Sequence, residues 1–127
     1  MQARIRFARR VFIAAAVYGL IVLLPQYFME ARIGLVYPPA ITHPEHFYGF
    51  IGLAVVWQFV FLLIAKDAFR YRALMPLAVL EKLAFGLPVL VLYAQSRVPY
   101  PVLAVALLDL FLGALFLSAY LRLPARG

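Results

Sequence analysis

Long apolar stretches separated by short polar segments set the pattern of this chain. Four of the stretches contain about 20 residues, the length of a helix that crosses a hydrocarbon core about 30 Å thick. They cover residues 7–29, 47–65, 73–94 and 101–121. The pattern therefore predicts an all-α membrane protein, in which residues 1–127 form a single domain with four transmembrane helices.

The composition supports a membrane protein and removes several kinds of chemistry. Hydrophobic residues make up 67% of the 127 residues and charged residues 13%, which leaves too little polar surface for a soluble domain of this size. There is no cysteine, so disulfides, thiolate metal ligands and cysteine nucleophiles are excluded. Glycine-rich phosphate loops and serine nucleophile motifs are also absent, and no cofactor is predicted.

The first apolar stretch follows a group of arginines, as the apolar region of a signal peptide does. Alanines at positions 14–16 add small residues to this likeness. However, the stretch continues from Leu20 to Leu24, and no polar domain follows it. It is therefore interpreted as a membrane anchor and not as a cleaved signal.

Basic residues concentrate on one side of the predicted helices. With four crossings, most of them fall on the same side, whereas Arg32 and Arg97 fall on the other. The first group consists of Arg4, Arg6, Arg9, Arg10, Lys66, Arg70, Arg72, Arg122 and Arg126. By the positive-inside rule this asymmetry places both termini in the cytoplasm, in a membrane of bacterial inner-membrane type. The net charge of +7 then reflects topology and attraction to membrane lipids, and no nucleic-acid partner is predicted.

The connections predict how the helices are arranged. Residues 66–72 and 95–101 form short turns, which make the three helices from residue 47 onward antiparallel neighbours in an up-down-up-down bundle. Residues 30–42 form a longer and partly apolar connection. This segment is expected to lie at the outer interface or to fold over the bundle, as a passive loop or as a lid.

The sequence His43-Pro44-Glu45-His46 allows two interpretations. Two histidines three residues apart lack the i, i+4 spacing of helical zinc motifs, and no third ligand is evident, so no metal site is predicted. Thr42 and Glu45 instead match a capping box, with Pro44 in the first turn of the helix. Helix initiation leaves the two histidines unexplained, and a metal or proton-transfer role for them stays open.

Three charged residues interrupt the apolar helices, where each costs free energy. At about 1.5 Å per residue, Lys82 lies roughly 13 Å from the inner end of its helix, and Asp109 lies roughly 12 Å from the outer end of the next. Both are then near the middle of the membrane, and an ion pair between them is predicted. Glu81 points about 100° away from Lys82 and is left without a partner. It can carry a proton, accept a hydrogen bond from Gln58 or a tyrosine, or meet an arginine of the inner loop.

A cavity is expected beside these charges. Pro88 removes a backbone hydrogen bond and should bend its helix one to two turns beyond them. Gly86 and Gly113 lie on the same helix faces as Lys82 and Asp109, so these faces should pack against other helices. The expected lining of the cavity is Trp57, Phe61, Phe85, Leu92 and Phe116. The candidate ligand-binding residues are Trp57, Gln58, Lys82, Phe85 and Phe116, and the candidate catalytic residues are Glu81 and Asp109.

Two classes of function fit this pattern. The first is a noncatalytic module, a helical subunit or a component that binds a lipid or another hydrophobic ligand, in which the Lys82–Asp109 pair specifies helix packing. Its partner would be another membrane protein chain, a second copy of itself or an apolar small molecule. The alternative is a membrane enzyme or proton-coupled carrier that acts on a sterol, isoprenoid, quinone or lipid through Glu81 and Asp109.

Overall fold

The computed structural model describes residues 1–125, and the secondary structure of this part of the chain is entirely helical. The elements are α1 (Gln2–Leu23), η1 (Leu24–Phe28), α2 (Glu30–Val36), α3 (Pro44–Lys66), η2 (Arg72–Leu74), α4 (Met75–Ala94) and α5 (Tyr100–Arg122). The segments long and apolar enough to cross a membrane are Gln2–Phe28, Pro44–Lys66, Arg72–Ala94 and Tyr100–Arg122. The predicted all-α chain with four such helices is therefore confirmed. Arg126, which was counted in the charge asymmetry, lies outside the described residues.

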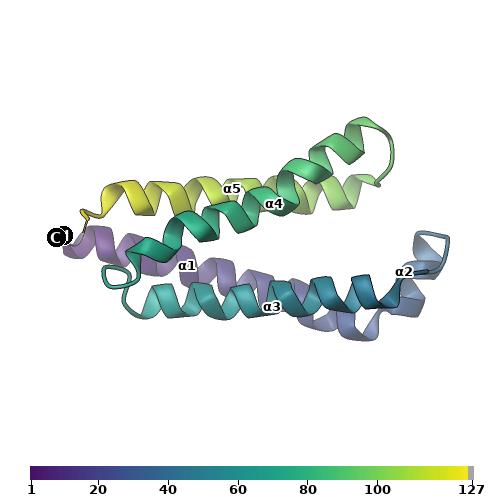
Figure 1. The fold of residues 1–127 in the computed structure, drawn as a ribbon, viewed down its shortest axis with the longest axis horizontal. Helices are drawn as coiled ribbons and strands as arrows, with labels where there is room; N and C mark the ends of the chain where they lie inside the picture. The colour runs from purple at the N-terminus through teal and green to yellow at the C-terminus, as the bar shows by residue number, and fades with distance from the viewer. Residues whose placement is uncertain (126–127) are drawn as a thin grey trace.

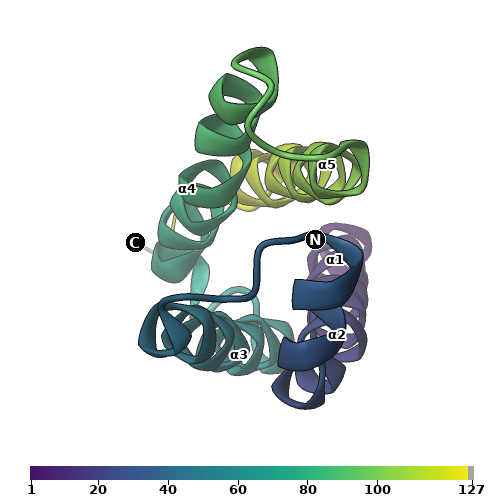
Figure 2. The same cartoon turned by 90° about the vertical axis from the view of Figure 1, so that its right-hand side faces the viewer.

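The long helices form two pairs, α1 with α3 and α4 with α5 (Figure 1). Figure 2 shows the pairs as separate layers at the end of the molecule where α2 lies, and the pairs approach each other at the end where α1 begins and α5 ends. At that end Arg4 Nη1 donates a hydrogen bond to the carbonyl oxygen of Arg122 at 3.3 Å. The molecule is therefore closed at one end and splayed at the other.

The pairing corrects one expectation about neighbours. The short connection after α3 was expected to make α3 and α4 packed neighbours, but they contact each other far less than α4 contacts α5. The buried residues of α4 follow a single stripe, Met75, Ala78, Lys82, Gly86 and Val89. Along its length α4 packs mainly on α5, while Met75 and Ala78 near its start also join the hydrophobic core formed with α1 and α3. The α4 helix, which contains Pro88, curves away from α3 along its length (Figure 1).

The distribution of polarity is the reverse of that in a soluble protein. Leucine and isoleucine side chains that are at least half exposed lie on the outer faces of the long helices, whereas Gln58, Lys82 and Asp109 are buried. Examples of the exposed group are Ile21, Leu53, Leu80, Leu107 and Leu121. Apolar outer faces of this extent require an apolar solvent, while the buried polar groups are shielded from it. This distribution is consistent with a multi-pass membrane protein.

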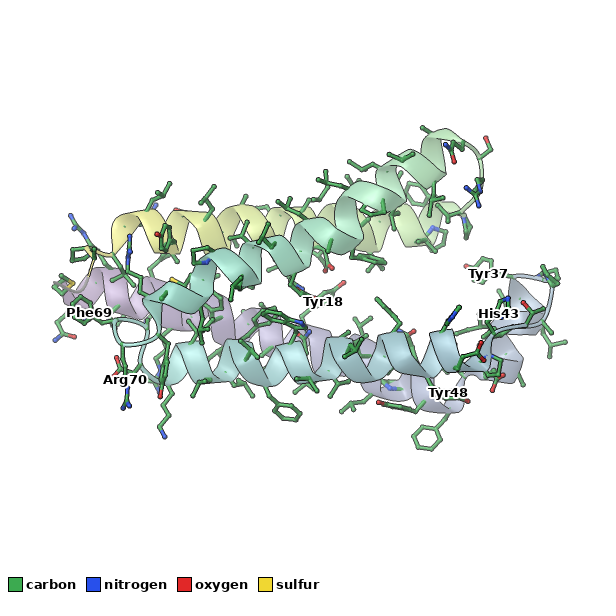
Figure 3. All side chains as sticks on the ribbon, viewed as in Figure 1. Tyr18, Tyr37, His43, Tyr48, Phe69 and Arg70 are labelled. Atoms are coloured by element: carbon green, nitrogen blue, oxygen red, sulfur yellow. The ribbon has the colours of Figure 1, made fainter. Side chains whose placement is uncertain are left out.

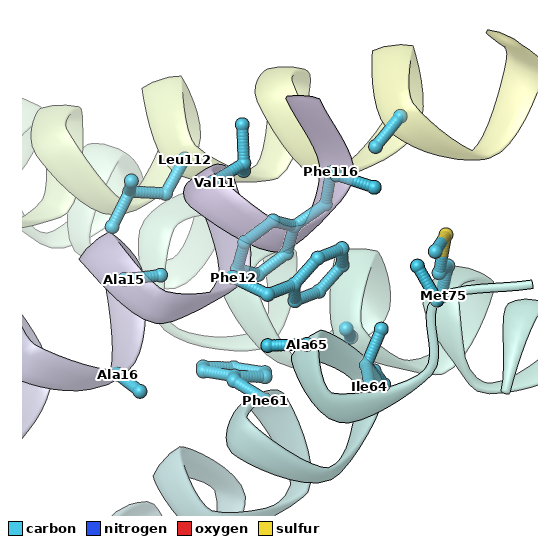
Figure 4. Packing of buried hydrophobic residues seen from close by; sticks show 14 of the residues in the cluster. Val11, Phe12, Ala15, Ala16, Phe61, Ile64, Ala65, Met75, Leu112 and Phe116 are labelled. Atoms are coloured by element: carbon cyan, nitrogen blue, oxygen red, sulfur yellow. The ribbon is translucent and has the colours of Figure 1, made fainter. Parts of the chain in front are cut away.

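An aromatic cluster joins the two helix pairs near the closed end (Figure 4). Phe12 of α1 stacks on Phe116 of α5 with ring centroids 4.2 Å apart, and Phe61 of α3 meets Phe116 edge to face at 5.0 Å. All three side chains are fully buried. Because this cluster draws on α1, α3 and α5 together, it holds the pairs against each other.

The α4–α5 contact depends on two glycines. A Cβ atom at Gly113 would lie 3.2 Å from the Cβ of Lys82, and one at Gly86 would lie 2.6 Å from the Cγ of Leu110. The absence of side chains thus lets the two backbones approach closely. The expectation that both glycines lie on packed faces is confirmed.

Replacing Gly113 by leucine is therefore expected to lower the free energy of unfolding by about 1–3 kcal/mol, because the new side chain forces α4 and α5 apart. Gly49→Leu is the matched control, since a Cβ at Gly49 meets nothing within 4 Å. Unfolding of both variants by sodium dodecyl sulfate, followed by circular dichroism, measures the difference. Equal stability of the two variants would show that the α4–α5 contact tolerates a larger side chain.

The start of α3 corrects the expected capping box. The helix begins at Pro44, so the N-cap residue is His43, and no side chain caps the first turn. Thr42 lies one residue further out, because proline occupies the first helical position and fixes where the helix starts. Glu45 instead approaches His43, with its Oε1 3.4 Å from the histidine Nδ1.

The connection between η1 and α3 contains a short helix of its own. The α2 helix covers Glu30–Val36, and Tyr48 of α3 donates a hydrogen bond to Glu30 Oε2 at 2.9 Å. This bond ties the start of α2 to α3, at the splayed end where Figure 3 shows Tyr48 and His43. The choice between a passive interfacial segment and a lid stays a prediction.

Candidate functional site

A cavity of about 360 Å³ lies between the two helix pairs. It is lined by residues of α1, η1, α3, α4 and α5, and Figure 3 shows Tyr18 projecting from α1 into the space between the pairs. Its polar lining consists of Tyr18, Gln26, Gln58, Glu81, Lys82 and Asp109. Its apolar lining includes Val22, Leu23, Phe50, Phe85, Val102 and Val105. The cavity thus combines apolar walls with one polar cluster, which is the usual makeup of a small-molecule site.

The polar cluster centres on Lys82. Its Nζ lies 3.5 Å from Asp109 Oδ1 on α5 and 3.5 Å from Glu81 Oε2 on its own helix. The same ammonium group lies 5.1 Å from the centre of the Phe61 ring, within range of a cation–π contact. The predicted Lys82–Asp109 ion pair is confirmed.

The expectation that Glu81 lacks a partner is wrong. Adjacent residues on a helix diverge by about 100°, but this angle describes where the side chains leave the backbone and not where they end. The flexible four-carbon stem of Lys82 brings its ammonium group between the two carboxylates. Arg72, an arginine at the inner end of the helix, does not pair with Glu81. Its Nε donates to the carbonyl oxygen of Leu123 at 2.8 Å, and its Nη2 donates to that of Tyr120 at 3.1 Å.

The three charged side chains differ in how deeply they are buried. The Lys82 side chain is 4% exposed, whereas those of Glu81 and Asp109 are 16% and 13% exposed. The lysine is therefore the most deeply buried of the three side chains, although Glu81 Oε2, the oxygen that faces it, is buried as well. Two carboxylates and one ammonium give a net formal charge of −1 when all three are ionised. An uncompensated buried charge is costly, so a further positive charge or a proton would stabilise the cluster.

Two buried acceptors of the site lack donors among the described residues. Gln58 is 2% exposed, and its Nε2 donates to the carbonyl oxygen of Ala54 at 2.8 Å. Its Oε1 faces α1 at Gly19, where an added Cβ would collide with it, and has no hydrogen-bond partner. Glu81 Oε2 also has no hydrogen-bond donor, although it lies within ion-pair distance of Lys82. Unpaired buried acceptors are unusual, and each requires a physical explanation.

The structure brings together some of the predicted site residues and separates others. Glu81, Asp109, Gln58, Lys82 and Phe85 all line the cavity. Trp57 and Phe116 do not line it, and neither do Phe61 and Leu92. Trp57 instead packs against the hydrophobic core, with 6.3 Å between its ring centre and that of Phe61. Phe116 lies two turns beyond Asp109 and belongs to the aromatic cluster.

Tyr18, Gln26 and Phe50 are among the residues of the site that were not identified as site residues from the sequence. Tyr18 and Gln26 lie in the first apolar stretch of the chain, and their polarity there is the signal that could have identified them. Phe50 carries no such signal. Its ring lies 5.8 Å from that of Phe85 across the α3–α4 interface.

The histidine segment has a more suitable geometry for metal binding than its spacing indicates. Glu45 supplies a third candidate ligand, and the ligand atoms of His43, Glu45 and His46 all lie within 4.8 Å of one another. The histidine rings are stacked with centroids 5.2 Å apart. All three residues are exposed. Stacking and the His43–Glu45 ion pair account for this arrangement without a metal, and a metal or proton-transfer role stays a hypothesis.

No protein-family model, curated protein or solved structure matches this chain. The fold alone does not determine what a small helical membrane protein does. The function is therefore inferred from the chemistry of the cavity.

Proposed function

We propose that the protein is a noncatalytic membrane protein that binds a hydrophobic small molecule or lipid in the cavity between its two helix pairs. The observation that carries this proposal is the apolar cavity of about 360 Å³ with one polar cluster in its wall. Apolar walls would provide binding energy, and the cluster would orient a single polar group of the ligand. The Lys82–Asp109 ion pair also joins α4 to α5, a packing role that requires no reaction.

Binding is best measured on the whole protein in phosphatidylcholine nanodiscs, with tritiated 1-nonanol as a neutral amphipathic probe and empty nanodiscs as the background. Saturable binding above this background is expected. Val105→Phe should weaken binding at least tenfold because the larger side chain fills part of the cavity. Leu107→Phe is the matched control, since Leu107 is 50% exposed on the outer face of the same helix. Equal binding to empty and loaded nanodiscs would contradict the proposal.

We also propose that all four long helices cross the membrane, with both termini on the cytoplasmic side of a bacterial-type inner membrane. The asymmetry of basic residues supports this orientation. It agrees with the position of the start of α1 and the end of α5 at one end of the molecule.

Because the chain has no cysteine, single cysteine variants provide a direct test of orientation. In spheroplasts, a membrane-impermeant maleimide is expected to label Gln95→Cys and to spare Gln2→Cys until the cells are lysed. Both residues are exposed, so access to the reagent depends on the side of the membrane. The reverse labelling pattern would show that the termini face outward.

A second candidate function is a membrane enzyme or proton-coupled carrier that uses Glu81 and Asp109 on a sterol, isoprenoid, quinone or lipid. The observation in its favour is that the two carboxylates share a single ammonium group. Infrared difference spectra of the natural protein and Glu81→Gln, recorded across pH, would detect a carboxyl that gains and loses a proton. A Glu81 carboxylate that stays ionised throughout cannot relay protons. A carrier would also require a dimer, so a monomer in nanodiscs would argue against transport.

A further inference from the structure

The charge of the cavity indicates what its ligand carries. Of the residues that line it, all within the described part of the chain, Lys82 is the single basic one, and Glu81 and Asp109 are the acidic ones. The groups that face this cluster from the other helices, Tyr18 of α1 and Gln58 of α3, add no positive charge. With all three groups ionised, the cavity wall carries a net formal charge of −1 that no other lining residue balances.

The burial of the three charged side chains favours the same ligand charge. Of the three charged side chains in the cavity wall, Lys82 is the most deeply buried, and those of Glu81 and Asp109 are more exposed. A ligand that suits this site would bring a positive charge and N–H donors. An anionic ligand would meet two carboxylates at close range, and a neutral alcohol would bring a donor without a charge.

We infer that the cavity binds a lipophilic amine in its protonated form, with the ammonium group on Glu81 and Asp109 and the hydrocarbon body against Phe50, Phe85 and Val105. This inference rests on the proposed function and specifies the class of ligand. Charge-assisted hydrogen bonds to carboxylates are stronger than neutral ones, and more so where water is excluded. The ammonium group would balance the cluster charge that Lys82 leaves uncompensated.

The test compares three probes with the same chain length, n-nonylamine, 1-nonanol and nonanoate, on the whole protein in phosphatidylcholine nanodiscs near neutral pH. The amine is expected to bind at least about tenfold more tightly than the alcohol, and nonanoate more weakly than either. Subtraction of binding to empty nanodiscs removes partitioning into lipid. Because the comparison uses the unmodified protein, its result does not depend on whether a variant folds.

Variants then locate the charge. Glu81→Gln is expected to remove at least about tenfold of amine affinity and so to reduce the preference for the amine over nonanol. Glu45→Gln is the matched control, because that carboxylate is exposed and lies outside the cavity. Size-exclusion chromatography and circular dichroism establish that each variant is folded.

The outcomes separate the inference from the proposed function. If amine and alcohol bind equally and Val105→Phe weakens both, the cavity is a binding site but the preference for an amine is wrong, as expected if a proton balances the cluster. If the amine is preferred but Glu81→Gln binds it as well as the natural protein does, the assignment of the ammonium to the Glu81 carboxylate is wrong. If none of the probes binds above empty nanodiscs, the inference and the proposed function both fail.

Discussion

Replacing Lys82 by methionine is expected to lower the free energy of unfolding by about 3–5 kcal/mol, the effect of removing one partner from a buried ion pair. Methionine keeps much of the lysine stem and removes the charge. The carboxylates of Glu81 and Asp109, each 3.5 Å from the ammonium in the natural protein, would then lie close together without a counter-charge. Unfolding by sodium dodecyl sulfate in mixed micelles, followed by circular dichroism, measures the loss.

Two further variants make this result interpretable. Lys66→Met removes an exposed lysine at the end of α3 and should change stability by less than about 0.5 kcal/mol. The double variant Lys82→Met, Asp109→Leu should recover most of the loss, because it removes one carboxylate together with the ammonium.

If the double variant also binds ligand normally, the pair serves packing only. If it folds but loses binding, the pair is part of the site. A loss of less than about 1 kcal/mol for Lys82→Met alone would show that the carboxylates need no ammonium.

The number and length of the helices could be predicted because the thickness of the membrane fixes how many apolar residues a crossing requires. Their ends could be predicted less well. The α1 helix begins at Gln2 and not near residue 7, because the arginines before the apolar stretch are good helix formers and continue the helix into the polar region. Loop length also gave the wrong partner for α3. A short connection brings two helix ends together, but the buried faces decide which helices pack along their length, and α3 packs on α1.

Depth along the helices was sufficient to predict the Lys82–Asp109 pair, because two residues at the same level of adjacent helices meet across the contact. It was not sufficient for Glu81, whose partner depends on the bend of the Lys82 side chain. Depth also gave no information on rotation of each helix about its axis. Trp57 therefore appeared equivalent to Gln58, although only Gln58 lines the cavity. Tyr18 of α1 was missed because the α1–α3 pairing was not predicted.

Phe116→Ala is expected to lower the free energy of unfolding by about 2–3 kcal/mol, which is less than the roughly 3–5 kcal/mol typical of removing a buried phenylalanine ring from a soluble protein. In lipid the ring stays in an apolar medium when the helices separate, so the transfer contribution largely disappears. The packing contribution remains, because Phe12 and Phe61 lose a partner at 4.2 and 5.0 Å and retain an unfilled space beside them. The measurement is the same detergent unfolding experiment.

Phe111→Ala is the matched control, since Phe111 lies on the same helix and is 58% exposed. It should cost little, and the difference between the two variants isolates the contribution of the aromatic cluster. Because Phe116 does not line the cavity, Phe116→Ala should bind the amine and alcohol probes as the natural protein does wherever both are folded. A variant that keeps its stability and loses binding would place Phe116 in the ligand site, as the sequence indicated. If the variant loses stability and keeps binding, Phe116 belongs to the packing that closes one end of the bundle. The cavity then lies toward the other end, where the two helix pairs are splayed.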